Sequence, residues 1–290
     1  MNATQKRVLL KEMLLSGETY PVPGVYDAVS ARVSEEAGFK AIYLGSFATA
    51  ASMLGLPDTG NVTMTEMAGH AKNIASATNI PLICDVEAGF FEAANICRTV
   101  WEFEQAGASA IHIEDHAFGK HTSLKPVITD VDTVCGKIRA AVDARTDPNF
   151  LIIGRSDTPW ATGDLEDTIY RANRYLEAGA DAVLLCWHLS GEEAGKLRKR
   201  INGPLIILND NRSLENEKKS GASLVLYWPM MLYAAFEGCR KAARIFMETG
   251  DIKKLEELNF NEEEFDKCIP FTGYTQRVEK YMLPSADDRG

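Results

Sequence analysis

Two pairs of carboxylates follow two short apolar runs, and these acids are the residues of the chain best suited to chemistry. Asp85 and Glu87 follow one run, and Glu114 and Asp115 follow the next. Such runs are typical of buried parallel strands, and the carboxyl ends of the strands in a parallel barrel all face one pocket. Mg²⁺ prefers oxygen ligands. The pattern therefore favours a metal site among these acids over two unrelated acidic turns.

Polar residues also end other expected strands. Arg155 ends one of them, where its guanidinium could hold a substrate carboxylate or phosphonate through two parallel hydrogen bonds. Taken alone, Arg155 could equally form a structural salt bridge, and Cys186 could simply fill space. The other candidates at strand ends are Tyr43, Gly45, Ser46, Cys186, Trp187, His188 and Asn209–Asn211.

A short phrase recurs along the chain and predicts the fold that would bring these ends together. In each copy a helical pattern ends at a glycine (Gly38, Gly107, Gly179 or Gly221) and a buried strand follows. The repeats favour an α/β fold, a (β/α)₈ TIM-type barrel, over a doubly wound open sheet. The expected strands are Tyr20–Val25, Ala41–Gly45, Pro81–Asp85, Ala110–Glu114, Phe150–Arg155, Ala182–Leu185, Pro204–Leu208 and Ser223–Tyr227.

Composition limits the kind of protein. The chain has 290 residues, of which 46% are hydrophobic and 25% charged, so one large core is feasible. We expect a single domain over residues 1–290, with an N-terminal helix at Gln5–Ser16 and a helical extension over about 251–290. The formal charge of −10 argues against a nucleic-acid partner, and no apolar run is long enough for a membrane span. Six scattered cysteines without a CxxC pair predict free thiols and a cytoplasmic location.

Four segments resemble the isocitrate lyase/phosphoenolpyruvate mutase superfamily, in particular its 2-methylisocitrate lyase and carboxyphosphonoenolpyruvate mutase branch. They are Pro23–Arg32, Ala51–Asp58, Ile113–Asp115 and Ile153–Asp157. The resemblance implies a barrel whose C-terminal helix is swapped between subunits of a homodimer or homotetramer. It also implies Mg²⁺, with Mn²⁺ as the alternative ion, and an enolate-like intermediate formed beside an α-oxo or α-hydroxy carboxylate.

The resemblance also assigns roles to individual residues. It places Asp85, Glu87 and Glu114 at the metal, and Asp58 and Lys120 among the catalytic residues. The substrate carboxylate would lie against Gly45, Ser46 and Arg155. Residues 116–130, which carry Lys120, would form a lid over the pocket, as a loop of this length often does.

The chain departs from the family pattern within the pocket. The gating-loop cysteine of the lyases is absent from Lys120–Leu124, so His121 or Ser123 would have to donate the proton. Cys186 stands where the lyases carry Glu and the mutases carry His. We therefore expect a substrate smaller or less charged than methylisocitrate that faces an apolar wall, with Phe90 and Phe91 near it.

Three functions remain open at this level. The first is a Mg²⁺-dependent lyase that cleaves a C–C bond in a small oxo- or hydroxy-acid. The second is C–P chemistry, either phosphonopyruvate hydrolysis or a mutase reaction, with Lys120 and Thr122 holding the phosphonyl oxygens. The third is a non-catalytic barrel that binds a small carboxylate, against which the intact Asp58, Asp85 and Arg155 argue.

Overall fold

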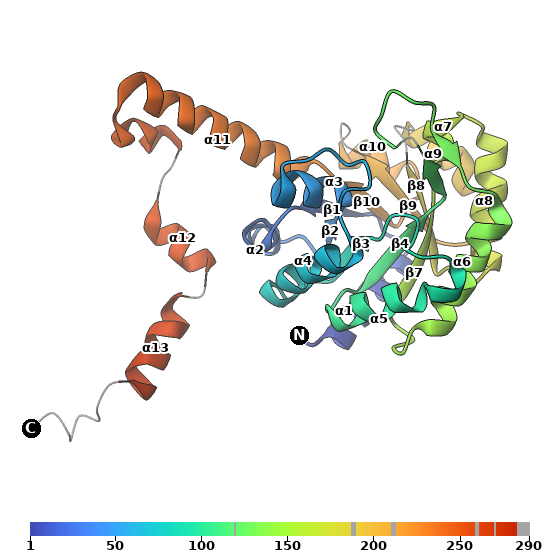
Figure 1. Cartoon of the computed structure of the whole chain (residues 1–290), viewed down its shortest axis with the longest axis horizontal. Helices are drawn as coiled ribbons and strands as arrows, with labels where there is room; N and C mark the ends of the chain where they lie inside the picture. The colour runs from blue at the N-terminus through green and yellow to red at the C-terminus, as the bar shows by residue number, and fades with distance from the viewer. Residues whose placement is uncertain (119, 187–189, 210–212, 259–260, 270, 283–290) are drawn as a thin grey trace, which may run out of the picture. The chain divides into compact units, whose positions relative to one another are not determined.

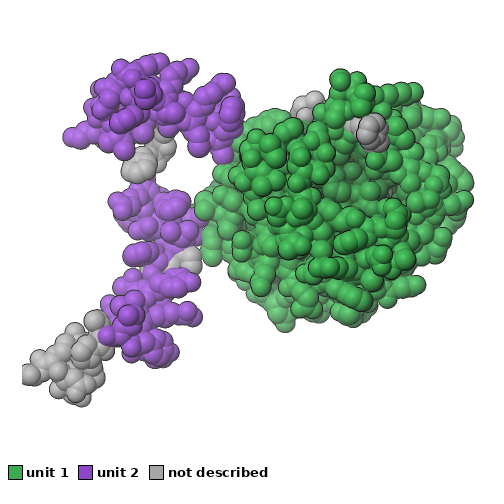
Figure 2. Space-filling model, in the orientation of Figure 1, with its two compact units in different colours: residues 1–233 green, residues 234–290 purple. Residues whose placement is uncertain are grey.

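The computed structural model describes residues 1–118, 120–186, 190–209, 213–258, 261–269 and 271–282. The chain divides into two compact units, residues 1–233 and 234–290, which Figure 2 colours separately. The division falls before residue 251, where the sequence predicts the C-terminal extension to begin. The single domain over 1–290 stays a prediction.

Unit 1 contains a closed barrel of eight parallel strands, which confirms the predicted fold class (Figure 1). Around the barrel the strands follow the order β1, β10, β9, β8, β7, β4, β3, β2. All eight predicted strands form, with ends that differ by at most one residue from the prediction. They are β1 (Tyr20–Val25), β2 (Ile42–Leu44), β3 (Leu82–Asp85), β4 (Ala110–Glu114), β7 (Leu151–Ser156), β8 (Ala182–Cys186), β9 (Leu205–Asn209) and β10 (Leu224–Tyr227).

Helices alternate with the strands and pack around the barrel (Figure 1). Thr63 and Asp164 begin α4 and α8, where each side chain accepts a hydrogen bond from a backbone N–H of the first turn. The helices of unit 1 are α1 (Ala3–Leu15), α2 (Ala28–Glu36), α3 (Ser46–Thr49), η1 (Ala50–Leu54), α4 (Met64–Ala77), η2 (Ala93–Asn95), α5 (Cys97–Gln105), α6 (Val131–Ala144), α7 (Thr158–Ala161), α8 (Leu165–Glu177), α9 (Gly191–Arg198) and α10 (Leu214–Lys218).

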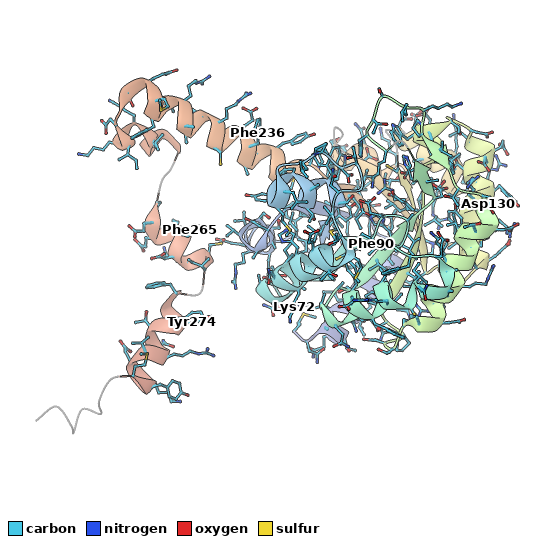
Figure 3. The ribbon with its side chains drawn as sticks, in the orientation of Figure 1. Lys72, Phe90, Asp130, Phe236, Phe265 and Tyr274 are labelled. Carbon is cyan, nitrogen blue, oxygen red and sulfur yellow. The ribbon has the colours of Figure 1, made fainter. Side chains whose placement is uncertain are left out.

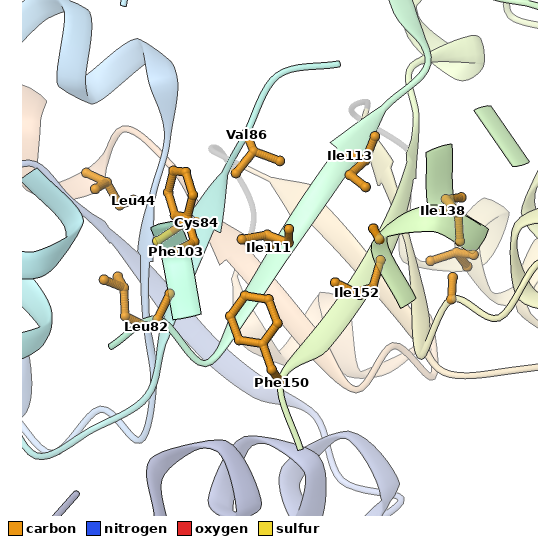
Figure 4. Packing of buried hydrophobic residues seen from close by; sticks show 14 of the residues in the cluster. Leu44, Leu82, Cys84, Val86, Phe103, Ile111, Ile113, Ile138, Phe150 and Ile152 are labelled. Atoms are coloured by element: carbon orange, nitrogen blue, oxygen red, sulfur yellow. The ribbon is translucent and has the colours of Figure 1, made fainter. Parts of the chain in front are cut away.

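Successive side chains of each strand point alternately out of the barrel and into it, which produces two hydrophobic layers. Ile111 and Ile113 point outward and pack with Phe103 of α5 and Ile138 of α6 (Figure 4). The neighbouring strand residues, such as Ile83 and Leu184, point into the barrel, where Leu10, Met13 and Leu14 of α1 join their cluster. Because apolar side chains fill this interior, the polar residues that could do chemistry are confined to the strand ends.

The segment after β4 has more structure than a simple loop. Its strand β5 (His116–Phe118) pairs in antiparallel fashion with β6 (Val127–Ile128). The residues between these two strands include Lys120 and His121, and His121 adopts a left-handed backbone with φ of 51°. The predicted lid over residues 116–130 is therefore a two-stranded ribbon with an irregular tip.

The second unit is helical and exposes many apolar side chains. Its elements are the greater part of α11 (Met230–Thr249), followed by η3 (Ile252–Leu258), α12 (Glu262–Cys268) and α13 (Phe271–Tyr281). Phe236, Phe265 and Tyr274, labelled in Figure 3, are 59%, 52% and 64% exposed. No helix in the described ranges is both long and apolar enough to cross a membrane.

Candidate active site

The carboxyl ends of three strands bring together the acids and the arginine that the sequence singles out. Asp85 ends β3 and Glu114 ends β4, and the register of the barrel sets Glu114 directly opposite Arg155 of β7. All three side chains are buried. A cavity of about 120 Å³ opens beside them, and Asp85 and Arg155 form part of its wall. The strand ends thus create one polar pocket.

Asp85, Glu87 and Glu114 form a compact cluster of carboxylates. One oxygen of each lies within 4.8 Å of an oxygen of the other two. The Lys120 ammonium lies among them, 2.7 Å from Glu87 Oε2 and 3.2 Å from Glu114. It also lies 3.6 Å from Asp58 Oδ2, so one buried cation contacts three acids. A second cavity of about 360 Å³ is lined by Glu87, Glu114 and Lys120, and Lys120 therefore borders both cavities.

The buried carboxylates of this cluster need nearby positive charge to stay ionised. Burial raises the pKa of Glu114 well above its usual range, although Lys120 and Arg155 act in the opposite direction. Burial also raises the pKa of Glu87. Burial acts to raise the pKa of Asp85 too, but neighbouring charges, that of Lys120 foremost, outweigh it and hold this pKa far below its usual range. A divalent cation would stabilise the ionised form of all three carboxylates.

The cluster fits a hard divalent cation. It supplies oxygen ligands, as Mg²⁺ requires, and its acids come from two neighbouring strand ends. One further observation supports the fit: Glu87 Oε1 is buried and has no hydrogen-bond partner among the residues that the structure describes. A buried oxygen in this state is costly, and coordination would satisfy it. The prediction of Mg²⁺ at Asp85, Glu87 and Glu114 is therefore compatible with the geometry.

A buried hydrogen-bond network fixes Arg155. Its Nε donates to Asp157 Oδ1 at 2.7 Å and its Nη2 to Asp157 Oδ2 at 3.1 Å, which makes a two-point clamp. Asp115 accepts from the Asp157 backbone N–H at 2.8 Å and from the Tyr175 hydroxyl at 2.8 Å. The remaining nitrogen of the guanidinium, Nη1, lies 3.1 Å from Glu114 Oε2. Arg155 is thus oriented from behind, with Nη1 toward the acids.

Residues in β2 and directly after it also contact the acid cluster. The Ser46 hydroxyl donates to Asp85 Oδ2 at 3.0 Å. Tyr43 lies close to both Asp85 and His112, with its hydroxyl 3.5 Å from Asp85 Oδ2 and 3.2 Å from His112 Nε2. Gly45 lines the smaller cavity, and a side chain at this position would crowd the Tyr43 ring. The structure therefore gathers these three candidates, and adds His112, which the sequence left out.

The candidate residues of the predicted lid, His121, Thr122 and Ser123, lie in different surroundings. His121 lines the smaller cavity and its Nε2 lies 3.4 Å from Asp58 Oδ2. Thr122 lines the larger cavity beside Glu87. Ser123 is exposed and does not line either cavity, so the two candidate proton donors are no longer equivalent.

The remaining predicted site residues lie at and after the ends of strands β8 and β9. Cys186 lines the smaller cavity and its sulfur accepts from Arg155 Nη2 at 3.4 Å. Asn209 ends β9, but its side chain lies outside the described part of the chain, as do Trp187, His188, Asp210 and Asn211.

The apolar wall differs from the one predicted. Phe47, Trp160 and Trp228 line the smaller cavity, and none of them was predicted from the sequence. Phe90, labelled in Figure 3, lines the larger cavity instead, and Phe91 packs against the outer hydrophobic layer. Trp228 follows β10 directly, so the strand-end criterion used for the polar residues would have found it.

Comparisons with known proteins agree with this geometry. A family model described as phosphoenolpyruvate phosphomutase matches residues 10–247. The chain is 36% identical over 206 residues to a 2,3-dimethylmalate lyase of Eubacterium barkeri, with 70% of each protein covered. It is 33% identical over 279 residues to a 2-methylisocitrate lyase of Aeropyrum pernix, with 93% of this chain and 89% of the relative covered.

A solved structure is similar over nearly the whole chain. A phosphonopyruvate hydrolase in complex with oxalate and Mg²⁺ superimposes with a TM-score of 0.87 and 27% identity, covering 98% of this chain and 100% of the other. The match thus extends from sequence to architecture, and one similar protein binds the ion that the acid cluster fits. The chain belongs to the phosphoenolpyruvate mutase/isocitrate lyase superfamily.

Proposed function

We propose that the protein is a Mg²⁺-dependent lyase that cleaves a C–C bond in a small α-hydroxy or α-oxo carboxylic acid. The observation that carries this proposal is the cluster of Asp85, Glu87 and Glu114 beside the fixed guanidinium of Arg155. Bound to the three acids, Mg²⁺ would act as a Lewis acid that stabilises the negative charge of an enolate. The similarity to the two lyases named above supports cleavage rather than binding alone.

For a hydroxy-acid substrate, the cleavage is redox-neutral and its atoms balance within the substrate. A base takes the proton of the hydroxyl at C2, and the electron pair of that O–H bond forms the carbonyl of a 2-oxo acid. The C2–C3 bond breaks, and its electron pair stays on C3 as an enolate of the departing carboxylate. An acid then returns one proton to C3. The protein therefore needs one acid, one base and a site for the developing charge.

His121 is the proposed proton donor to C3. It lines the smaller cavity, where Ser123 does not, and Asp58 can orient its ring through the contact of 3.4 Å. An imidazole oriented by a carboxylate is a common acid and base in enzymes. His121 would take the place of the cysteine that the lyases carry in the gating loop.

Arg155 and Ser46 are the proposed anchors of the substrate carboxylate. Arg155 is held by Asp157 through two hydrogen bonds, so its Nη1 is oriented before the substrate arrives. A preoriented donor needs no rearrangement in the transition state, and the loss of one such donor often costs about 3 kcal/mol of barrier. Ser46 lies beside Asp85 and could turn its hydroxyl toward the same carboxylate.

C–P bond chemistry is the second candidate function. Thr122 and Lys120 both line the larger cavity, where they could hold the oxygens of a phosphonyl group. The likeness to a phosphonopyruvate hydrolase favours this alternative as well. Cleavage of phosphonopyruvate would release inorganic phosphate, which C–C cleavage does not.

We further propose that the protein works as a homodimer or homotetramer in the cytoplasm. The exposed apolar side chains of the second unit, among them Phe246 and Met247, favour burial against another copy. The six cysteines are free thiols, which favours a reducing compartment.

One panel of substrates separates these functions. The protein is incubated with hydroxy- and oxo-dicarboxylates and with phosphonopyruvate, each with Mg²⁺ and with EDTA, and the products are identified by NMR. Formation of a 2-oxo acid that depends on Mg²⁺ supports the lyase. Release of phosphate from phosphonopyruvate alone supports the second candidate, and binding without any product would support the non-catalytic barrel.

A further inference from the structure

The loop that follows β3 holds a proposed metal ligand in a backbone conformation that few side chains adopt. Glu87 has φ of 50°, Gly89 has φ of 97° and Phe90 has φ of 60°. Three residues other than glycine have positive φ in the described part of the chain, and two of them lie in this loop. A side chain in this left-handed region costs free energy and persists only where surrounding contacts impose it. The contacts that fix this loop, called here the Glu87 loop (residues 86–91), therefore decide where the Glu87 carboxylate points.

Two buried side chains from neighbouring helices donate hydrogen bonds to carbonyls of the Glu87 loop. Lys137 of α6 donates from Nζ to the Ala88 oxygen at 3.0 Å. Thr99 of α5 donates from Oγ1 to the Gly89 oxygen at 2.8 Å. Lys137 is 8% exposed and Thr99 is fully buried, and neither lines either cavity of the active site. Both residues thus hold the loop from outside the space that the two cavities offer a substrate.

The same loop is bonded to the other two acids of the proposed metal site. The Glu87 N–H donates to Asp85 Oδ1 at 2.8 Å, and the Glu87 carbonyl accepts from the Glu114 N–H at 3.0 Å. Glu87 Oε1 is buried and has no hydrogen-bond partner among the described residues, so it is available to an ion. A change of φ at Glu87 would break these two backbone bonds and move its carboxylate relative to Asp85 and Glu114. The left-handed conformation is therefore part of the geometry of the acid cluster.

Lys137 has one charged neighbour that offers another explanation for its position. Its Nζ lies 3.8 Å from Glu92 Oε2, but the Glu92 side chain is 82% exposed. An ion pair with so exposed a carboxylate stabilises a protein by little. The ammonium also cannot serve by attracting the ion, because a positive charge repels Mg²⁺. Of its described contacts, the hydrogen bond to the Ala88 carbonyl is therefore the one that uses a buried ammonium.

We propose that Lys137 and Thr99 are positioning residues, which hold the Glu87 loop in its strained conformation and thereby direct the Glu87 carboxylate to the divalent cation. The inference rests on the proposed metal site but not on the reaction that the protein catalyses, because it concerns binding of the ion alone. Without these two donors, Glu87 can relax to negative φ, and the acid cluster loses one of its ligands. Partners that orient a metal ligand from behind typically account for about 10–100-fold in metal affinity.

Calorimetric titration with Mg²⁺ in the absence of substrate tests this role. Lys137→Met and Thr99→Val preserve most of the side-chain volume and remove the donor, and each should raise the Kd for Mg²⁺ about 10–100-fold. The direction is informative for Lys137→Met, since the loss of a positive charge would by itself tighten the binding of a cation. Thr99→Ser keeps the hydroxyl and should bind Mg²⁺ as the wild type does. Arg139 is exposed on the same helix as Lys137, so Arg139→Met is the matched control for a lost positive charge and should leave the Kd unchanged.

Hydrogen exchange shows whether the effect arises in the loop. In EDTA, the amides of residues 86–91 should exchange faster in Lys137→Met and Thr99→Val than in the wild type, while those of α9 should not. Weaker Mg²⁺ binding together with this local change supports the proposal, and either variant decides it alone if the other fails to fold. A wild-type Kd in a folded variant, or weaker binding with unchanged exchange over the loop, would overturn it.

The outcomes also separate this inference from the proposed function. If the wild type binds no Mg²⁺, the metal site and the positioning role are both refuted. If it binds Mg²⁺ but cleaves no hydroxy- or oxo-acid, the lyase proposal fails, and the variants still decide the positioning role by their Kd. Cleavage that depends on Mg²⁺, combined with an unchanged Kd in both variants, would leave the lyase standing and overturn the role of Lys137 and Thr99.

Discussion

Replacing Lys120 by methionine is expected to make the stability of the protein depend on Mg²⁺. The Lys120 ammonium is buried, with 9% of its side chain exposed, and it contacts Glu87, Glu114 and Asp58 at 2.7, 3.2 and 3.6 Å. Methionine preserves most of the side-chain volume and removes the charge. The acids then face one another without their nearest cation.

The magnitude follows from the loss of a buried ion-pair partner. Removing one partner of a buried pair typically destabilises a protein by about 3–5 kcal/mol, because the remaining charge is uncompensated. At about 2–4 °C per kcal/mol, the midpoint of thermal unfolding should fall by roughly 6–20 °C in EDTA. Millimolar Mg²⁺ supplies the missing charge, so it should restore most of the loss and raise the midpoint far more in Lys120→Met than in the wild type.

Thermal unfolding in EDTA and in Mg²⁺ tests this expectation, with Lys125→Met as the matched control. Lys125 lies in the same loop and is exposed, so its replacement should change the midpoint little under either condition. Calorimetry adds a second measurement: the variant should bind Mg²⁺ more tightly than the wild type, because no ammonium has to leave the acids. A variant as stable as the wild type in EDTA, or one with an unchanged response to Mg²⁺, would refute the view that Lys120 neutralises this cluster.

Further predictions concern single groups and the assembly. His121→Gln should lower kcat by about 10²–10⁴-fold in single-turnover assays if His121 donates the proton, whereas Ser123→Ala should not; comparable losses in the two variants would contradict this assignment. Asp157→Asn should lower kcat/KM by about a hundredfold with Arg155 still present, since the guanidinium loses its fixed orientation. Tyr175→Phe should cost about 1–3 kcal/mol in chemical unfolding because it removes a donor from buried Asp115. Light scattering should give the mass of a dimer or tetramer, and a monomer at micromolar concentration would count against the proposed assembly.

The barrel could be predicted because its signals are local. Each buried strand is a short apolar run, and the glycines that end the preceding helices, such as Gly107 and Gly179, adopt the left-handed backbone that their position requires. The carboxyl ends of parallel strands face one pocket, so Asp85, Glu114 and Arg155 could be placed together from the sequence alone.

The parts that could not be predicted depend on contacts between distant segments. Phe47 and Trp160 lie on helices of four residues each, and nothing in their sequence neighbourhood distinguishes an aromatic residue that lines a cavity from one that packs in the core. The β5–β6 ribbon pairs two short strands across a polar segment, where the hydrophobic pattern is too brief to indicate a strand. The position of Lys120 among the acids likewise follows from the path of that ribbon.

Formation of a 2-oxo acid from small 2-hydroxy dicarboxylates, measured with Mg²⁺ and again with EDTA, tests the proposed lyase most directly. We predict turnover with Mg²⁺ at a kcat within the usual enzymatic range of about 1–10³ per second. We also predict its loss in EDTA and in Glu114→Gln, with the second product being the matching carboxylic acid in a one-to-one ratio. Unchanged rates without the metal, or no cleavage of any hydroxy- or oxo-acid while phosphonopyruvate is consumed, would contradict the proposed lyase.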